Sequence, residues 1–127
     1  GTDITLITYG LATAATMQAA QQLAEEGIEA EVLDLRSLLP LDMDTVLESV
    51  GRTRRAVIAH NATTFAGPGA EVAAQISAKL FGVLAEPVQR VGAQFTPIPA
   101  RASEFAVTLG VDGIVHAART AMGAVHV

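Results

Sequence analysis

Histidine is the side chain best suited to proton transfer near neutral pH, and one of the three histidines in this sequence stands where such chemistry could occur. His60 follows the apolar run 56–59 at the end of a predicted buried strand. There it could transfer a proton or hydrogen-bond across an interface, together with its neighbour Asn61. The alternative is a histidine whose nitrogens are satisfied locally, and the sequence leaves both open. His116, within a predicted helix, and His126, near the end of the chain, are expected to be surface residues.

A glycine-rich loop follows this strand and precedes a predicted helix, Ala70–Phe81. Gly67 and Gly69 flank Pro68 there, and the free N–H groups and dipole of a helix N-terminus can bind an anion. However, the Lys-Ser/Thr ending of a phosphate-binding P-loop is missing, and Glu71 in the first turn could itself satisfy the dipole. We therefore favour a structural role for this loop and keep an anion or docking site as the alternative.

Other catalytic chemistries find no support in the sequence. The chain contains no cysteine, which excludes disulfides, thiolate catalysis and cysteine-based zinc sites. No two histidines have the spacing of metal ligands, and no serine lies in the nucleophile turn of a serine hydrolase. The first predicted strand ends in a single glycine, Gly10, whereas a dinucleotide fingerprint needs three. We therefore expect neither a metal site nor a nucleotide-binding first loop.

Length and charge set broad limits. With 127 residues, half of them apolar, the chain fits one domain, residues 1–127, with a substantial core. The net charge of −5 argues against nucleic acid and anionic membranes as partners. No apolar run reaches the roughly 18 residues needed to span a bilayer, and there is no signal-peptide pattern. These features predict a cytoplasmic location.

The elements that must position these residues alternate between strand and helix. Apolar runs bounded by turn residues predict the strands Ile4–Thr8, Glu29–Leu38, Ala56–His60 and Val88–Gly92. Periodic apolar residues and caps predict helices over Thr13–Glu26, from an Asp42 cap to Gly51, over Ala70–Phe81, near Ser103–Leu109 and over Asp112–Met122 with Asp112 as cap. In the first helix, Met17, Ala20, Leu23 and Ala24 are expected on the buried face.

This alternation predicts an α/β fold with three layers, α/β/α. A mainly parallel sheet would be covered by helices on both faces and joined by right-handed crossovers. In such sheets, ligands and partners meet the loops that follow the carboxyl ends of the strands. Those loops are 9–13, 36–42, 60–69 and 92–100. We expect any function to concentrate there.

Five segments of the chain resemble one known family. They are "DITLITYG", "AEVLDLRSLLPLDMDTVLESVGRTRRAVIAHNA", "GPGAEVAAQI", "PVQRVGAQFTPIPA" and "GVDGIVHAARTAM". Together they resemble the C-terminal transketolase-like domain of the beta subunit of a thiamine diphosphate-dependent 2-oxo acid dehydrogenase, in its decarboxylating component. The pyruvate, branched-chain and acetoin dehydrogenase complexes have such a subunit. The resemblance covers nearly the whole chain, and "DLRSLLPLD" is its most specific part.

The resemblance implies a parent oxidoreductase that uses thiamine diphosphate and Mg²⁺ to decarboxylate a 2-oxo acid and acylate the lipoyl group of an acyltransferase core. In that class a Gly-Asp-Gly motif followed by Asn binds the diphosphate, and this sequence lacks the motif. We therefore expect a fragment of a longer subunit that binds no cofactor, carries no catalytic residue and is inactive alone. The absence of an initiator Met favours the same view.

The resemblance also implies partners and a strand order. The partners would be the other subunits of the parent component, in a homo- or hetero-oligomer, and the peripheral-subunit-binding domain of the acyltransferase core. The sheet would have about four parallel strands in the spatial order 2-1-3-4. The family's antiparallel edge strand, which precedes the segment "DIT", is missing here, so one sheet edge is expected to be bare.

Three loops at the expected functional end depart from the family pattern. The family's His-Glu becomes His60-Asn61, its Gly-Gly-Phe-Gly becomes residues 66–69, and its Asp-Thr-Pro-x-Pro-Tyr becomes residues 95–100. The docking-loop candidates in the last segment are Phe95, Pro97 and Pro99. The apolar core pattern matches that of the family. The resemblance therefore predicts the fold more firmly than the roles of individual loop residues.

Two alternative functions remain open. One is the equivalent domain of a transketolase or a deoxyxylulose-phosphate synthase, which share the fold. The other is a free-standing module that binds an anion through the glycine-rich loop. The match over "DLRSLLPLD" and "TPIPA" favours the dehydrogenase over the first alternative.

Overall fold

A parallel sheet forms the centre of the computed structural model, which describes residues 1–94 and 109–123. Its strands are β1 (Ile4–Thr8), β2 (Ala30–Asp34), β3 (Ala56–Thr63) and β4 (Gln89–Ala93). Within the described residues they lie in the order β2-β1-β3-β4, and every pair is parallel. The predicted fold class and strand order are confirmed. Phe95, Pro97, Pro99, most of the predicted helix near Ser103–Leu109, and His126 lie outside the described residues.

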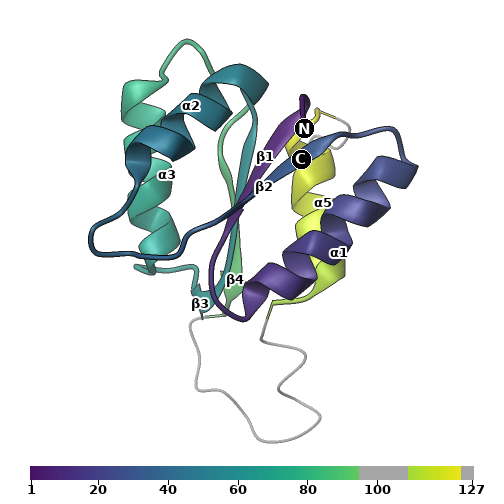
Figure 1. Cartoon of the computed structure of the whole chain (residues 1–127), viewed down its shortest axis with the longest axis horizontal. Coiled ribbons are helices and arrows are strands. Elements are labelled where there is room, and N and C mark those ends of the chain that lie inside the picture. The colour runs from purple at the N-terminus through teal and green to yellow at the C-terminus, as the bar shows by residue number, and fades with distance from the viewer. Residues whose placement is uncertain (95–108, 124–127) are drawn as a thin grey trace, which may run out of the picture.

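Helices cover both faces of the sheet, as Figure 1 shows. The helices α1 (Ala12–Glu25) and α5 (Val111–Ala121) lie on one face, and α2 (Met43–Thr53) and α3 (Pro68–Lys79) lie on the other. Side chains of a strand alternate between faces, so Ile4 and Leu6 pack against α1 and α5 while Ile7 packs against α2 and α3. All five residues of β1 are buried, as expected of a central parallel strand.

The buried face of α1 differs from the prediction in two residues. Leu23 is fully buried as expected and Ala20 packs against the core, but Met17 and Ala24 are exposed and Thr16 takes the inward position. Thr16 can be buried because its hydroxyl donates to the carbonyl of Ala12, one turn earlier, at 2.8 Å. The small side chain of Ala19 completes the contact with the sheet. Local hydrogen bonding therefore places a polar residue where apolar periodicity predicted methionine.

The N-terminus of α2 is confirmed, but its predicted end is wrong. The Asp42 carboxylate caps the helix by accepting the backbone N–H of Thr45 at 3.2 Å. The helix then continues through Gly51 and ends at Arg54, whose φ of 62° is left-handed. A glycine inside a helix costs about 1 kcal/mol. Burial of Val50 on one side of Gly51 and of Thr53 on the other offsets that cost.

The start of α5 also differs from the prediction. Gly110, rather than Asp112, is the N-cap residue, and Asp112 lies in the first turn. Its carboxylate there faces the positive end of the helix dipole, which is favourable without a direct capping bond. His116 is exposed, as expected. The helix packs against α1 through the apolar core, and an exposed ion pair between Arg119 and Glu26 also joins the two.

Candidate functional site

The carboxyl ends of the four strands lie at one edge of the sheet, toward the lower side of Figure 1. The described loops at this edge are 9–11 after β1, 35–42 after β2 and 64–67 between β3 and α3. Partners and ligands of parallel α/β sheets meet this edge. It therefore contains the candidate functional site.

His60 is a buried polar residue at this edge. Its side chain is 2% exposed, and β3 continues past it to Thr63 rather than ending there as predicted. The backbone N–H of Gly69 donates to Nε2 of His60 at 3.0 Å, so Nε2 must carry the lone pair. The hydrogen is then on Nδ1, which donates to the carbonyl oxygen of Ala62 at 3.0 Å. The imidazole is thus neutral, with both nitrogens satisfied within the chain.

Three glycines surround the imidazole: Gly67 and Gly69 at the start of α3, and Gly92 in β4. A Cβ atom added at Gly69 would lie 2.4 Å from Nε2 of His60, closer than any real contact. One at Gly67 would lie 2.1 Å from the carbonyl oxygen of Thr63 and 3.2 Å from Cε1 of His60. One at Gly92 would lie 3.1 Å from the same Cε1. The glycines are required here because backbone approaches an aromatic ring closely.

This packing bears on the possible anion site. The N–H of Gly69 is engaged by the imidazole, so the N-terminus of α3 has one donor fewer to offer an anion. Glu71 is exposed and accepts a hydrogen bond from Nε2 of Gln75 at 2.9 Å. Asn61 is exposed beside the buried His60. Of the predicted site residues, the structure therefore brings His60, Gly67 and Gly69 into direct contact, while Asn61 and Glu71 stand at the surface.

Tyr9 links the end of β1 to this cluster. Its ring centroid lies 5.8 Å from that of His60, with the ring planes tilted by 50°. Partial burial raises the pKa of the Tyr9 phenol above its usual value. The contact between Tyr9 and His60 was not foreseen from the sequence, because the two residues are far apart along the chain.

The β3–α3 loop (Thr64–Gly67) is anchored to β4 on its other side. The guanidinium of Arg90 donates to the carbonyl oxygen of Thr64 at 2.8 Å, and the N–H of Thr64 donates to the carbonyl of Ala93 at 3.1 Å. Ala66 has a left-handed φ of 57°. These constraints leave Phe65, at the tip, 67% exposed.

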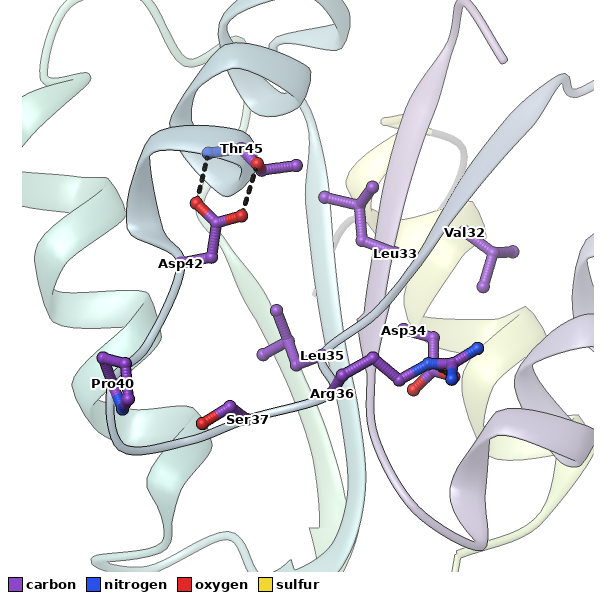
Figure 2. A pocket seen from close by; sticks show the side chains of 9 residues that line it. All are labelled: Val32, Leu33, Asp34, Leu35, Arg36, Ser37, Pro40, Asp42 and Thr45. Atoms are coloured by element: carbon purple, nitrogen blue, oxygen red, sulfur yellow. Dashed lines mark hydrogen bonds and ion pairs between the residues drawn. The ribbon is translucent and has the colours of Figure 1, made fainter.

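A second feature of this edge is a hollow of about 300 Å³ between β2 and the first turn of α2. Figure 2 shows it between Leu33 of β2, Leu35 just after that strand, and the turn at Pro40. Its carboxylates are already partnered. Asp42 accepts from Thr45, which lowers the pKa of its carboxyl. Asp34 pairs with Arg36 at 3.0 Å and accepts from the hydroxyl of Thr13.

Exposed apolar side chains occur on all three loops. Leu11 is 89% exposed after β1, Leu39 is 94% exposed in the turn closed by a Leu38–Leu41 bridge, and Phe65 is exposed after β3. We call Leu11, Leu39 and Phe65 the apolar rim. These three loops follow the carboxyl ends of parallel strands, where partners of such sheets bind. Sequence reasoning missed them, although each is an apolar residue in a predicted loop.

The described residues contain neither a cluster of metal-binding side chains nor a membrane-spanning helix. Within 1–94 and 109–123, no three potential metal-binding side chains of His, Cys, Asp or Glu come together. In the same part of the chain, no helix has the length and apolar character to cross a bilayer. Both nitrogens of His60 and the carboxylates of Asp34 and Asp42 have partners within the chain.

The fold and this edge define a three-layer α/β domain with a parallel sheet in the order 2-1-3-4 and an apolar rim at its carboxyl end. The chain belongs to the transketolase C-terminal domain family, whose pattern it matches over residues 1–114. The family resemblance predicted from the sequence is confirmed.

Two curated relatives are beta subunits. The chain is 44% identical over 99 residues to the beta subunit of acetoin:2,6-dichlorophenolindophenol oxidoreductase of Cupriavidus necator, covering 78% of this chain and 29% of the relative. It is 43% identical over 99 residues to the pyruvate dehydrogenase E1 component subunit beta of Bacillus subtilis, covering 78% of this chain and 30% of the relative. The chain thus spans less than a third of the length of the curated relatives it matches.

Two solved structures share the fold. A split-gene transketolase, described as an inactive beta4 tetramer, has a TM-score of 0.80 and 30% identity, covering 97% of this chain and 39% of that one. A 2-oxoglutarate:ferredoxin oxidoreductase from Magnetococcus marinus has a TM-score of 0.61 and 14% identity, covering 94% of this chain and 18% of that one. The second similarity concerns the fold alone.

Proposed function

We propose that this chain is the C-terminal assembly domain of the beta subunit of a 2-oxo acid dehydrogenase decarboxylating component. Its role would be to contact other subunits, and the peripheral-subunit-binding domain of the acyltransferase core, through the apolar rim. The observation that carries this proposal is the exposure of Leu11, Leu39 and Phe65 at one end of the domain. The names of the relatives, which are subunits of larger enzymes, support it.

The parent enzyme would decarboxylate a 2-oxo acid with thiamine diphosphate and Mg²⁺ and transfer the acyl group to a lipoyl arm. The residues that the structure describes do not fit that cofactor. The carboxylates of the hollow, Asp34 and Asp42, are engaged by neighbours, and the described residues contain no cluster of metal ligands. We therefore place the cofactor elsewhere in the parent. Calorimetry with thiamine diphosphate and Mg²⁺ should give no heat of binding, whereas saturable micromolar binding would overturn this placement.

We also propose that residues 1–127 are one domain of a longer subunit, inactive alone and cytoplasmic. The share of the relatives' length that the chain matches supports the single-domain assignment. The test of the assembly role is binding of an isolated peripheral-subunit-binding domain to the full-length subunit. Specific saturable binding that is lost on changing the rim supports the proposal. Unchanged binding after rim substitution contradicts it.

A second candidate is the equivalent domain of a transketolase. The 30% identity to the split-gene transketolase over 97% of this chain favours it. The two candidates differ in the reaction of the assembled enzyme. Ketol transfer between sugar phosphates would support the transketolase, and acylation of a lipoyl domain would support the dehydrogenase.

A further inference from the structure

We propose that neutral His60 is the positioning residue of the β3–α3 loop, and that protonation of its Nε2 releases this loop from α3. The state of the loop, and with it the position of Phe65 in the apolar rim, would then depend on pH. The consequence for subunit contact rests on the proposed function. The release of the loop does not, because it can be observed in the chain without a partner.

The first support is that one imidazole joins both ends of the loop. Nδ1 of His60 donates to Ala62, which precedes the loop, and Nε2 accepts from Gly69, in the first turn of α3. Gly67 is the N-cap residue of α3 and has no side chain with which to cap it. The imidazole therefore supplies, from β3, the acceptor that an N-cap side chain normally supplies.

The second support is the chemistry of protonation. A proton on Nε2 removes the only acceptor that the ring offers to Gly69, and it sets two N–H donors against each other. The new positive charge would also lie at the positive end of the α3 dipole, where cations are disfavoured. The ring cannot move aside without displacing backbone, because the backbone of Gly67, Gly69 and Gly92 lies against it.

The third support is the surroundings of the ring. In the loop after β1, Tyr9 contacts it as a neutral phenol. On α3, Glu71 is exposed and bonded to Gln75, and on β4, Arg90 bonds to the carbonyl of Thr64. Within the described residues no carboxylate forms an ion pair with His60 that would stabilise its cation. While the loop is bonded to His60, no paired negative charge among the described residues therefore offsets the charge of a protonated ring.

Amide hydrogen exchange of the Gly69 N–H, followed by NMR, tests the proposal. We expect its protection factor to fall at least about tenfold between about pH 7.5 and about pH 5.5, while that of Ile58 in β3 is unchanged. The ¹⁵N shifts of the His60 ring should report Nδ1–H at the higher pH and the imidazolium at the lower. His60→Gln, which can accept but does not titrate, should abolish the pH dependence. The matched control His116→Gln removes an exposed histidine and should preserve it.

Two results would overturn the proposal. One is an unchanged Gly69 protection factor while the ring nitrogens report the cation. The other is a His60 ring that stays neutral throughout this pH range. The ¹⁵N shifts of the unsubstituted chain are enough to show this. If the loop is released but binding of the peripheral-subunit-binding domain does not change, the loop proposal stands and the assembly role of the rim is contradicted.

Discussion

Nε2 of His60 lies 3.0 Å from the backbone nitrogen of Gly69 and caps α3 from a neighbouring strand. The arrangement requires glycine at position 69, because a Cβ there would lie 2.4 Å from Nε2. A single close approach thus explains both why the histidine is buried and why the loop is rich in glycine. It also yields the first prediction.

Gly69→Ala should destabilise the fold by about 2 kcal/mol, since the new methyl group must displace the imidazole or the helix start. The measurement is urea unfolding followed by circular dichroism. Gly51→Ala is the matched control. Gly51 lies inside α2 with no atom within 4 Å of an added Cβ, so alanine should stabilise by about 0.5–1 kcal/mol. Equal effects at both positions would contradict the steric explanation.

Two threonines of β1 allow a comparison of partnered and unpartnered hydroxyls. Both Thr5 and Thr8 are fully buried, but Thr5 bonds to Ser49 and Thr53 at 2.8 Å each, whereas Oγ1 of Thr8 has no partner. Thr5→Val should cost about 1–2 kcal/mol, because it removes the buried hydrogen bonds to Ser49 and Thr53, although the Thr53 hydroxyl keeps its bond to the carbonyl of Arg55.

Thr8→Val, by contrast, should be neutral or stabilising by up to about 1 kcal/mol, since it removes a buried hydroxyl that forms no bond. The free energy of unfolding in urea measures both variants. The same loss of stability for Thr8→Val as for Thr5→Val would show that the Thr8 hydroxyl does have a partner in solution.

The apolar rim gives a prediction for assembly. Leu39→Asp should weaken binding of the peripheral-subunit-binding domain to the full-length subunit at least about tenfold, because a buried unpaired carboxylate costs more than 1.4 kcal/mol. Titration calorimetry measures the dissociation constant. Phe81→Ser is the control, since Phe81 is 90% exposed but lies after α3, at the other end of the sheet. A larger effect at Phe81 would move the contact surface to that end.

The ion pair between Glu26 and Arg119 predicts that the free energy of unfolding decreases at acidic pH. The hydrogen bond from Arg119 lowers the pKa of Glu26 below its usual value of 4.5. Since the folded-state pKa is depressed, the contribution of the pair is present above pH 4.5 and is lost as the pH falls through the folded-state value. Glu26→Gln should remove this part of the pH dependence. The unfolding midpoint against pH, at low and high salt, measures it.

The sequence by itself determined the fold class, the strand order implied by the resemblance, and the loops at which function was expected. These follow from signals between near neighbours, such as the unbroken apolar run of β1 and the cap at Asp42. The errors fell where packing outweighed such signals. Buried neighbours carried α2 through Gly51, and Thr16, satisfied by its own helix, displaced Met17 from the core.

Only the tertiary structure decided which groups satisfy His60. Tyr9, Gly69 and Gly92 reach the imidazole from three different elements, and no local pattern encodes their meeting. The same holds for Thr5 and Thr8, which read alike in the sequence but differ because α2 offers hydroxyls to one face of β1 alone. Periodicity specifies which face a side chain occupies. The partner that it meets there depends on how distant segments pack.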